Sequence, residues 1–116
     1  MERDRKEEIV KYMAIGLEHY QLGFGHFLGY SIRGDSRFVN SVCPLGAACL
    51  GKGIDPHLLE DMTIDDMAFE QVANYLGITT RDTHKIAGSW DELECSNLLD
   101  NPELLPELAK KIIREA

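Results

Sequence analysis

The order of apolar and polar residues along the 116-residue chain predicts a succession of short helices. In the first segment, apolar residues recur at three- and four-residue intervals, which predicts an amphipathic helix from about Arg5 to Tyr20. A second segment, from Pro44 to Leu50, holds only apolar or small residues and is followed by two glycines within residues 51–53. A helix that is apolar on every side belongs in the interior. We therefore expect the rest of the chain to pack around residues 44–50.

Capping residues and glycines divide the second half of the chain into further helices. These signals predict helices over about residues 55–61, 63–76, 79–87 and 101–116. Residues Gly88 to Glu92 have the pattern of one helix that ends at a glycine, followed by the capping box of a new helix. Pro106 lies in the first turn of the last helix, so its regular part is expected from about Leu105. The helix over 63–76 is expected to face the core with Ile64, Met67, Ala68, Val72, Tyr75 and Leu76.

Residues 21–42 have the least helical composition of the chain. Glycines alternate there with aromatic residues, which fits a short helix between glycine turns or a loop packed by its own aromatics. Residues 37–42 have partial alternation and predict one short strand, for which residues 29–32 are the nearby partner and Gly34-Asp35 the turn. The expected fold is thus all-α or mainly α. It is a single compact multi-helix domain over residues 1–116, with at most a small β-hairpin near 29–42.

Composition places the chain among ordinary globular proteins, with 44% hydrophobic and 28% charged residues. It contains no run of about 18 apolar residues that would span a membrane. The first eight residues are charged with mixed sign and lack the apolar region of a signal peptide. We therefore expect a cytoplasmic protein that does not engage a membrane. Three cysteines, an odd number, argue against a disulfide framework.

Charge is distributed unevenly along the chain, whose net charge is −8. Residues 1–54 carry a net charge of +1, residues 55–107 carry −11 and residues 108–116 carry +2. An acidic second half disfavours direct nucleic-acid binding and suits a protein partner with a basic surface. It also suits an acidic nucleic-acid mimic or an inhibitor of the phage type. The candidate partner contacts are Glu60, Asp61, Glu70, Glu94 and the single tryptophan, Trp90.

Cys43 is the candidate catalytic residue, because the positive end of a helix lowers the pKa of a thiol placed there. A cysteine enzyme also needs a base, and His19, His26, His57 and His84 stand in no recognisable signature around it. The alternative, which we favour, is that Cys43 and Cys49 are buried, reduced thiols of the core. Neither histidine nor carboxylate spacing indicates a metal site, and we expect no cofactor.

The aromatic–glycine segment over residues 23–38 is the candidate site for a small ligand. It places aromatic and histidine side chains beside two arginines, a combination that would hold a flat or anionic molecule. The candidate contacts are Phe24, His26, Phe27, Tyr30, Arg33 and Arg37. The alternative is that these aromatics fill the space over a glycine-rich bend.

Two short motifs resemble a family of small, uncharacterised bacterial and phage domains. One is C-x-L-G-A at the start of a helix, matched by Cys43, Leu45, Gly46 and Ala47; the other is I…W-[ND]-[DE], matched by Ile86, Trp90, Asp91 and Glu92. The resemblance spans residues 40–92 and implies no particular activity. It implies that Trp90-Asp91 packs beside the helix that follows Cys43.

These observations favour a non-enzymatic regulatory or adaptor protein that acts through protein–protein contacts, with a homodimer as one form of such contact. One alternative is a small-ligand-binding protein, or a minor cysteine-dependent enzyme, that uses residues 23–38. The other is the acidic nucleic-acid mimic, which requires the carboxylates of residues 55–107 to lie on one face.

Overall fold

The fold is described from a computed structural model, which describes residues 1–24, 27–33, 37–60, 66–95 and 102–116. Within these residues the chain is mainly α-helical, with one small sheet. The elements are α1 (Arg3–Gly16), β1 (Gln21–Leu22), β2 (Leu28–Arg33), β3 (Arg37–Val42), α2 (Pro44–Lys52), α3 (Pro56–Glu60), α4 (Asp66–Leu76), α5 (Thr80–Asp91), the 3-10 turns η1 (Glu92–Cys95) and η3 (Pro102–Leu104), and α6 (Leu105–Glu115). This confirms the predicted fold class.

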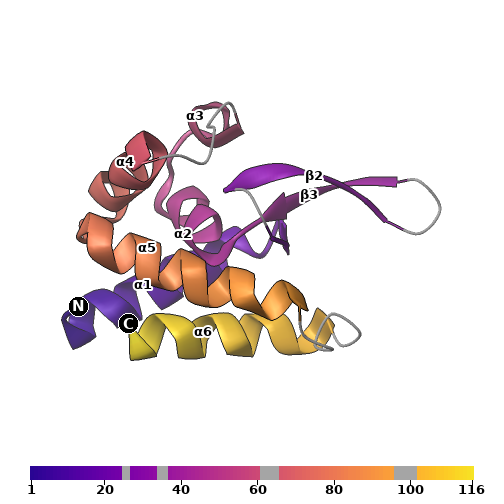
Figure 1. The fold of residues 1–116 in the computed structure, drawn as a ribbon. Helices are drawn as coiled ribbons and strands as arrows, with labels where there is room; N and C mark the ends of the chain where they lie inside the picture. The colour runs from indigo at the N-terminus through magenta and orange to yellow at the C-terminus, as the bar shows by residue number, and fades with distance from the viewer. Residues whose placement is uncertain (25–26, 34–36, 61–65, 96–101) are drawn as a thin grey trace.

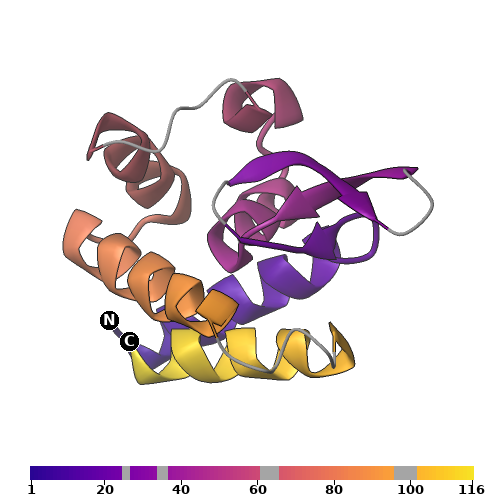
Figure 2. The same cartoon turned by 45° about the vertical axis from the view of Figure 1, so that its right-hand side comes forward.

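Helix α2 forms the centre of the molecule, as its composition predicts. Its residues from Pro44 to Cys49 are all buried, and α1, α4, α5 and the inner end of the hairpin surround it (Figures 1 and 2). The helix continues to Lys52, two residues further than predicted. The glycine that ends it is Gly53, whose φ of 100° is a left-handed conformation that favours glycine.

Close backbone approach at glycines brings the central helices together. A Cβ atom at Gly46 would lie 1.9 Å from the carbonyl oxygen of Phe27, and one at Gly16 would lie 2.1 Å from that of Ala47. A Cβ atom at Gly51 would lie 1.8 Å from the carbonyl oxygen of Tyr12. Real Cβ atoms do not approach an oxygen so closely. The crossing of α1 and α2, and the start of β2 against α2, therefore require glycine.

The predicted hairpin near residues 29–42 is confirmed and forms part of a sheet with the strand order β1-β3-β2. Strands β2 and β3 pair antiparallel, from Leu28 opposite Val42 to Arg33 opposite Arg37. The predicted turn at Gly34-Asp35 lies outside the described residues. Strand β1, which the sequence did not indicate, pairs in parallel with the last two residues of β3. A strand of two residues is too short to produce a detectable alternation.

One boundary prediction and one burial prediction in the second half were wrong. Helix α5 does not stop before Gly88 but continues to Asp91, so that Ile86 and Trp90, four residues apart, are both fully buried. Met67, expected in the core, is 70% exposed, and the buried side of α4 is made by Ala68, Val72, Ala73 and Leu76. The expected start of this helix at residue 63 lies outside the described residues. The regular part of α6 begins at Leu105, as predicted.

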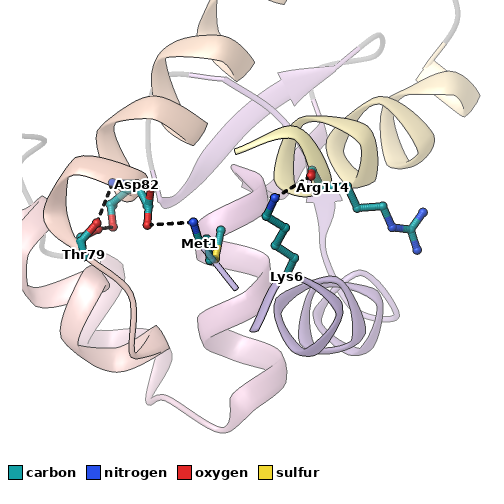
Figure 3. A network of polar contacts seen from close by, with 6 residues as sticks. Met1, Lys6, Thr79, Asp82 and Arg114 are labelled. Atoms are coloured by element: carbon teal, nitrogen blue, oxygen red, sulfur yellow. Dashed lines mark hydrogen bonds and ion pairs between the residues drawn. The ribbon is translucent and has the colours of Figure 1, made fainter. Parts of the chain in front are cut away.

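The N-terminal end of α1 is tied to α5 and α6 by the polar contacts drawn in Figure 3. The amino group of Met1 lies 3.9 Å from the carboxylate of Asp82, whose backbone N–H is accepted by the capping hydroxyl of Thr79. Lys6 Nζ donates to the carbonyl oxygen of Arg114, at 2.9 Å. These contacts bring the two ends of the chain together (Figure 1). In the part of the chain that the structure describes, no helix has the length and apolar character needed to cross a membrane.

Candidate functional site

Cys43 caps the N-terminus of α2 and is 7% exposed. Its Sγ accepts the backbone N–H of Gly46, at 3.3 Å. Burial raises the pKa of the Cys43 thiol from its ordinary value of 9.0 to about 12, and the nearby charge of Asp91 raises it too. The backbone amides at the start of α2 lower this pKa, but by less than burial raises it. Burial also raises the pKa of the Cys49 thiol. This geometry favours core thiols over an activated nucleophile.

We expect Cys43 and Cys49 to resist modification in the folded protein. A pKa of about 12 lowers the thiolate fraction of Cys43 at pH 8 by about a thousandfold relative to an ordinary thiol. The measurement is the rate of reaction with a water-soluble disulfide reagent in Cys95→Ser protein, with and without denaturant. Fast reaction of both thiols without denaturant would contradict their placement in the core.

The aromatic residues proposed to hold a ligand are instead part of the core where the structure describes them. Phe24 stacks on Trp90, with ring centroids 4.9 Å apart, and Phe27, 3% exposed, packs edge-to-face on Phe69 at 5.5 Å. The two phenylalanines thus pack on different aromatic partners. His26 lies outside the described residues. Tyr30, Arg33 and Arg37 are placed only by their register in β2 and β3.

Trp90 is fully buried, which removes it from the candidate partner contacts. Its Nε1 donates a hydrogen bond of 2.8 Å to the carbonyl oxygen of Gly23, linking α5 to the residue after β1. The indole is large and apolar with one polar atom, so a buried site with a single acceptor satisfies it completely. The side chain of Trp90 therefore connects α5 to the segment that follows β1. Helix α5 packs against α2, and the charge of Asp91 at the end of α5 acts on the Cys43 thiol at the start of α2.

The acidic candidates are distributed over several elements. Glu60 is in α3, Glu70 in α4 and Glu94 in η1, whereas Asp61 lies outside the described residues. Glu70 and Glu94 are exposed, and the Glu60 side chain is 31% exposed and lies 3.7 Å from His57. Helix α3 stands at the top of the molecule and α6, which carries Glu107, lies along the bottom (Figures 1 and 2). The described carboxylates among the candidates are therefore carried by separate elements of the fold.

Helices α3 and α4 each carry one exposed apolar side chain and one of these acids. Leu58 is 53% exposed and Met67 is 70% exposed, in the same two helices as Glu60 and Glu70. We call these four residues the α3–α4 surface. Sequence reasoning missed its apolar part, because Met67 fits the apolar stripe of the helix and Leu58 lies in a helix too short to have a stripe. Exposed apolar side chains among charged ones are typical of protein-binding surfaces.

A cleft beside the sheet lies away from these candidate residues. A cleft of about 410 Å³ is bordered by the end of α1, by β1 and by the start of α6. Its lining includes Tyr20, Leu22, Leu105 and the exposed Glu103, and none of the residues predicted to bind a ligand. Among the described residues, no group of three or more histidine, cysteine or acidic side chains is arranged to hold a metal ion.

Comparison of the chain with protein-family models, with curated proteins and with solved structures found no match. The resemblance to small bacterial and phage domains therefore stays a prediction.

Proposed function

We propose that this protein is a non-enzymatic regulatory or adaptor protein of the cytosol, and that its α3–α4 surface binds a protein with a Lys- or Arg-rich surface. The observation that carries the proposal is the exposure of Leu58 and Met67 in the same helices as Glu60 and Glu70. Apolar contact supplies affinity to such an interface, and the carboxylates select the sign of the partner's charge.

The electrostatics of the chain support a basic protein rather than a nucleic acid as the partner. Residues 55–107, which include both helices, carry a net charge of −11, and phosphates would be repelled by it. The buried Cys43 supports a binding role over a nucleophilic one. The aromatic–glycine segment gives a ligand-binding function less support, since Phe24 and Phe27 are engaged in the core.

The proposal predicts salt-dependent capture that depends on the α3–α4 surface. Wild-type protein and Glu60→Lys/Glu70→Lys protein are immobilised in parallel and exposed to a lysate of the native cell. We expect the wild type to retain a basic protein, with release at about 0.5 M salt, where charges are screened beyond a few ångströms. The double variant should retain at least about tenfold less, because like charges now face each other.

Glu18→Lys/Glu115→Lys protein is the matched control, since both residues are exposed and lie in other parts of the chain. Equal capture by wild-type and Glu60→Lys/Glu70→Lys proteins would contradict the proposal. Retention of nucleic acid as the bound species would contradict it as well.

A further inference from the structure

The cleft between the end of α1, strand β1 and the start of α6 has the size of a small-molecule site. Its volume of about 410 Å³ lies within the range of about 300–1,000 Å³ that is typical of ligand pockets. Helices α1 and α6 pack on each other, and the two ends of the chain lie together at one end of this pair (Figures 1 and 2). The end of α1 and the start of α6 therefore lie together at the other end, where β1 borders the space between them.

The apolar lining of the cleft is continuous with the hydrophobic core. Leu22 and Leu105 line the cleft but are only 6% and 4% exposed. Leu17, Tyr20 and Pro106 line it as well and are half-buried. Side chains that are close-packed in a core hold one arrangement. The cleft therefore offers a preformed apolar surface, which binds the apolar part of a ligand without first having to reorganise.

The charge of the cleft comes from a single carboxylate at its rim. Gln21 and Glu103 line the cleft and are both exposed, so they stand on its solvent-facing side. Of the seven described residues that line the cleft, Glu103 alone carries a charge at neutral pH, and none is basic. Glu103 has no hydrogen-bond or ion-pair partner among the described residues, whereas Glu107, one turn further along, pairs with Lys110 at 3.1 Å. The Glu103 carboxylate is therefore available to a cation that enters the cleft.

We propose that this cleft binds a small amphiphilic cation, with an aliphatic body on the apolar lining and an ammonium group paired with Glu103. An anionic ligand of the same shape would bring a like charge to Glu103, in a chain whose net charge of −8 already repels anions. A ligand charged along its whole length would place charge on Leu22 and Leu105, where nothing apolar compensates for its lost hydration. The site lies apart from the α3–α4 surface and adds small-molecule binding to the function proposed above.

A series of alkylammonium ions tests the site. Butyl-, hexyl- and octylammonium chloride are titrated into the isotope-labelled full chain at low salt, and backbone amide signals are followed by NMR. We expect saturable shifts at the amides of Leu17, Gln21, Leu22 and Leu105. Each added CH₂ group should tighten binding by about two- to fourfold, because it places more apolar surface on the lining. Octanoate, which has the same number of carbon atoms as octylammonium and the opposite charge, should bind about tenfold more weakly.

Substitutions at Glu103 test the charged contact. Glu103 is exposed, so both Glu103→Gln and Glu103→Lys proteins should fold, and their amide spectra verify this. Glu103→Gln is expected to weaken octylammonium binding by about two- to fivefold, the usual value of an exposed ion pair. Glu103→Lys should reverse the preference, so that octanoate binds more tightly than octylammonium. Glu107→Gln is the matched control, because it removes the same charge from an exposed residue that does not line the cleft, and it should leave both affinities unchanged.

Three results would overturn the inference: no saturable shifts with millimolar octylammonium, shifts that map away from the cleft, or equal binding of octylammonium and octanoate. Equal affinities in Glu103→Gln and Glu107→Gln proteins would also exclude the pairing with Glu103. The outcome is independent of the function proposed above, because Glu103→Gln protein should capture a basic protein as well as wild type does. Failure of either proposal therefore leaves the other standing.

Discussion

Replacement of Gly46 by leucine is expected to destabilise the protein by about 3 kcal/mol or more, the upper end of the range for over-packed cores. A Cβ atom at this position would lie 1.9 Å from the carbonyl oxygen of Phe27 and 2.7 Å from its carbonyl carbon. Both are backbone atoms, so no flexible side chain can move aside. Small domains have total stabilities of about 5–15 kcal/mol. The loss should lower the melting temperature by about 10 °C or more.

Gly46→Ala and Gly88→Ala proteins form the matched pair for this prediction. Both glycines lie inside helices, but a Cβ atom at Gly88 would have nothing within 4 Å. Alanine at position 88 is therefore expected to stabilise α5 by about 0.5–1 kcal/mol, the usual gain from removing a glycine. Alanine at position 46 should lower the melting temperature despite the same gain in helix propensity. Equal effects at the two positions would show that the contact with Phe27 is not tight.

The central helix and the hairpin could be predicted because their signals are local. Pro44 at the start of α2, glycines at its end and the absence of any polar residue between identify a buried helix without reference to the rest of the chain. The end of α5 could not be predicted in this way. Gly88 is a stop signal in isolation, yet burial of Ile86 and Trp90 on one side of the helix outweighs the cost of a glycine, which is about 1 kcal/mol.

The candidate sites depended on long-range packing and were predicted less well. The burial of Cys43 follows from the apolar composition of α2, so the sequence alone could predict that Cys43 is a core thiol. The pairing of Phe24 with Trp90 brings together residues 66 positions apart and has no local signal. Met67 was assigned to the core because periodicity cannot distinguish the edge of an apolar stripe from its centre.

Replacement of Trp90 by alanine is expected to destabilise the protein by about 3–5 kcal/mol, the usual range for a large buried aromatic residue. The indole is fully buried, stacks on Phe24 and donates to the carbonyl oxygen of Gly23. Its loss would leave a cavity between α5 and the residues after β1. Chemical denaturation followed by circular dichroism measures this change. Trp90→Phe protein separates the two contributions, because it keeps a ring but removes the N–H, and should lose about 1–3 kcal/mol.

Ile15→Ala protein is the control for these variants, because Ile15 is a large apolar residue in a helix but is 40% exposed. We expect its stability to stay within about 0.5 kcal/mol of wild type. The single tryptophan also reports its own environment, so the wild type should show the blue-shifted emission of a buried indole. Red-shifted emission, or a Trp90→Ala protein as stable as the control, would contradict the placement of Trp90 in the core. It would also restore Trp90 as a candidate contact for a partner at the surface.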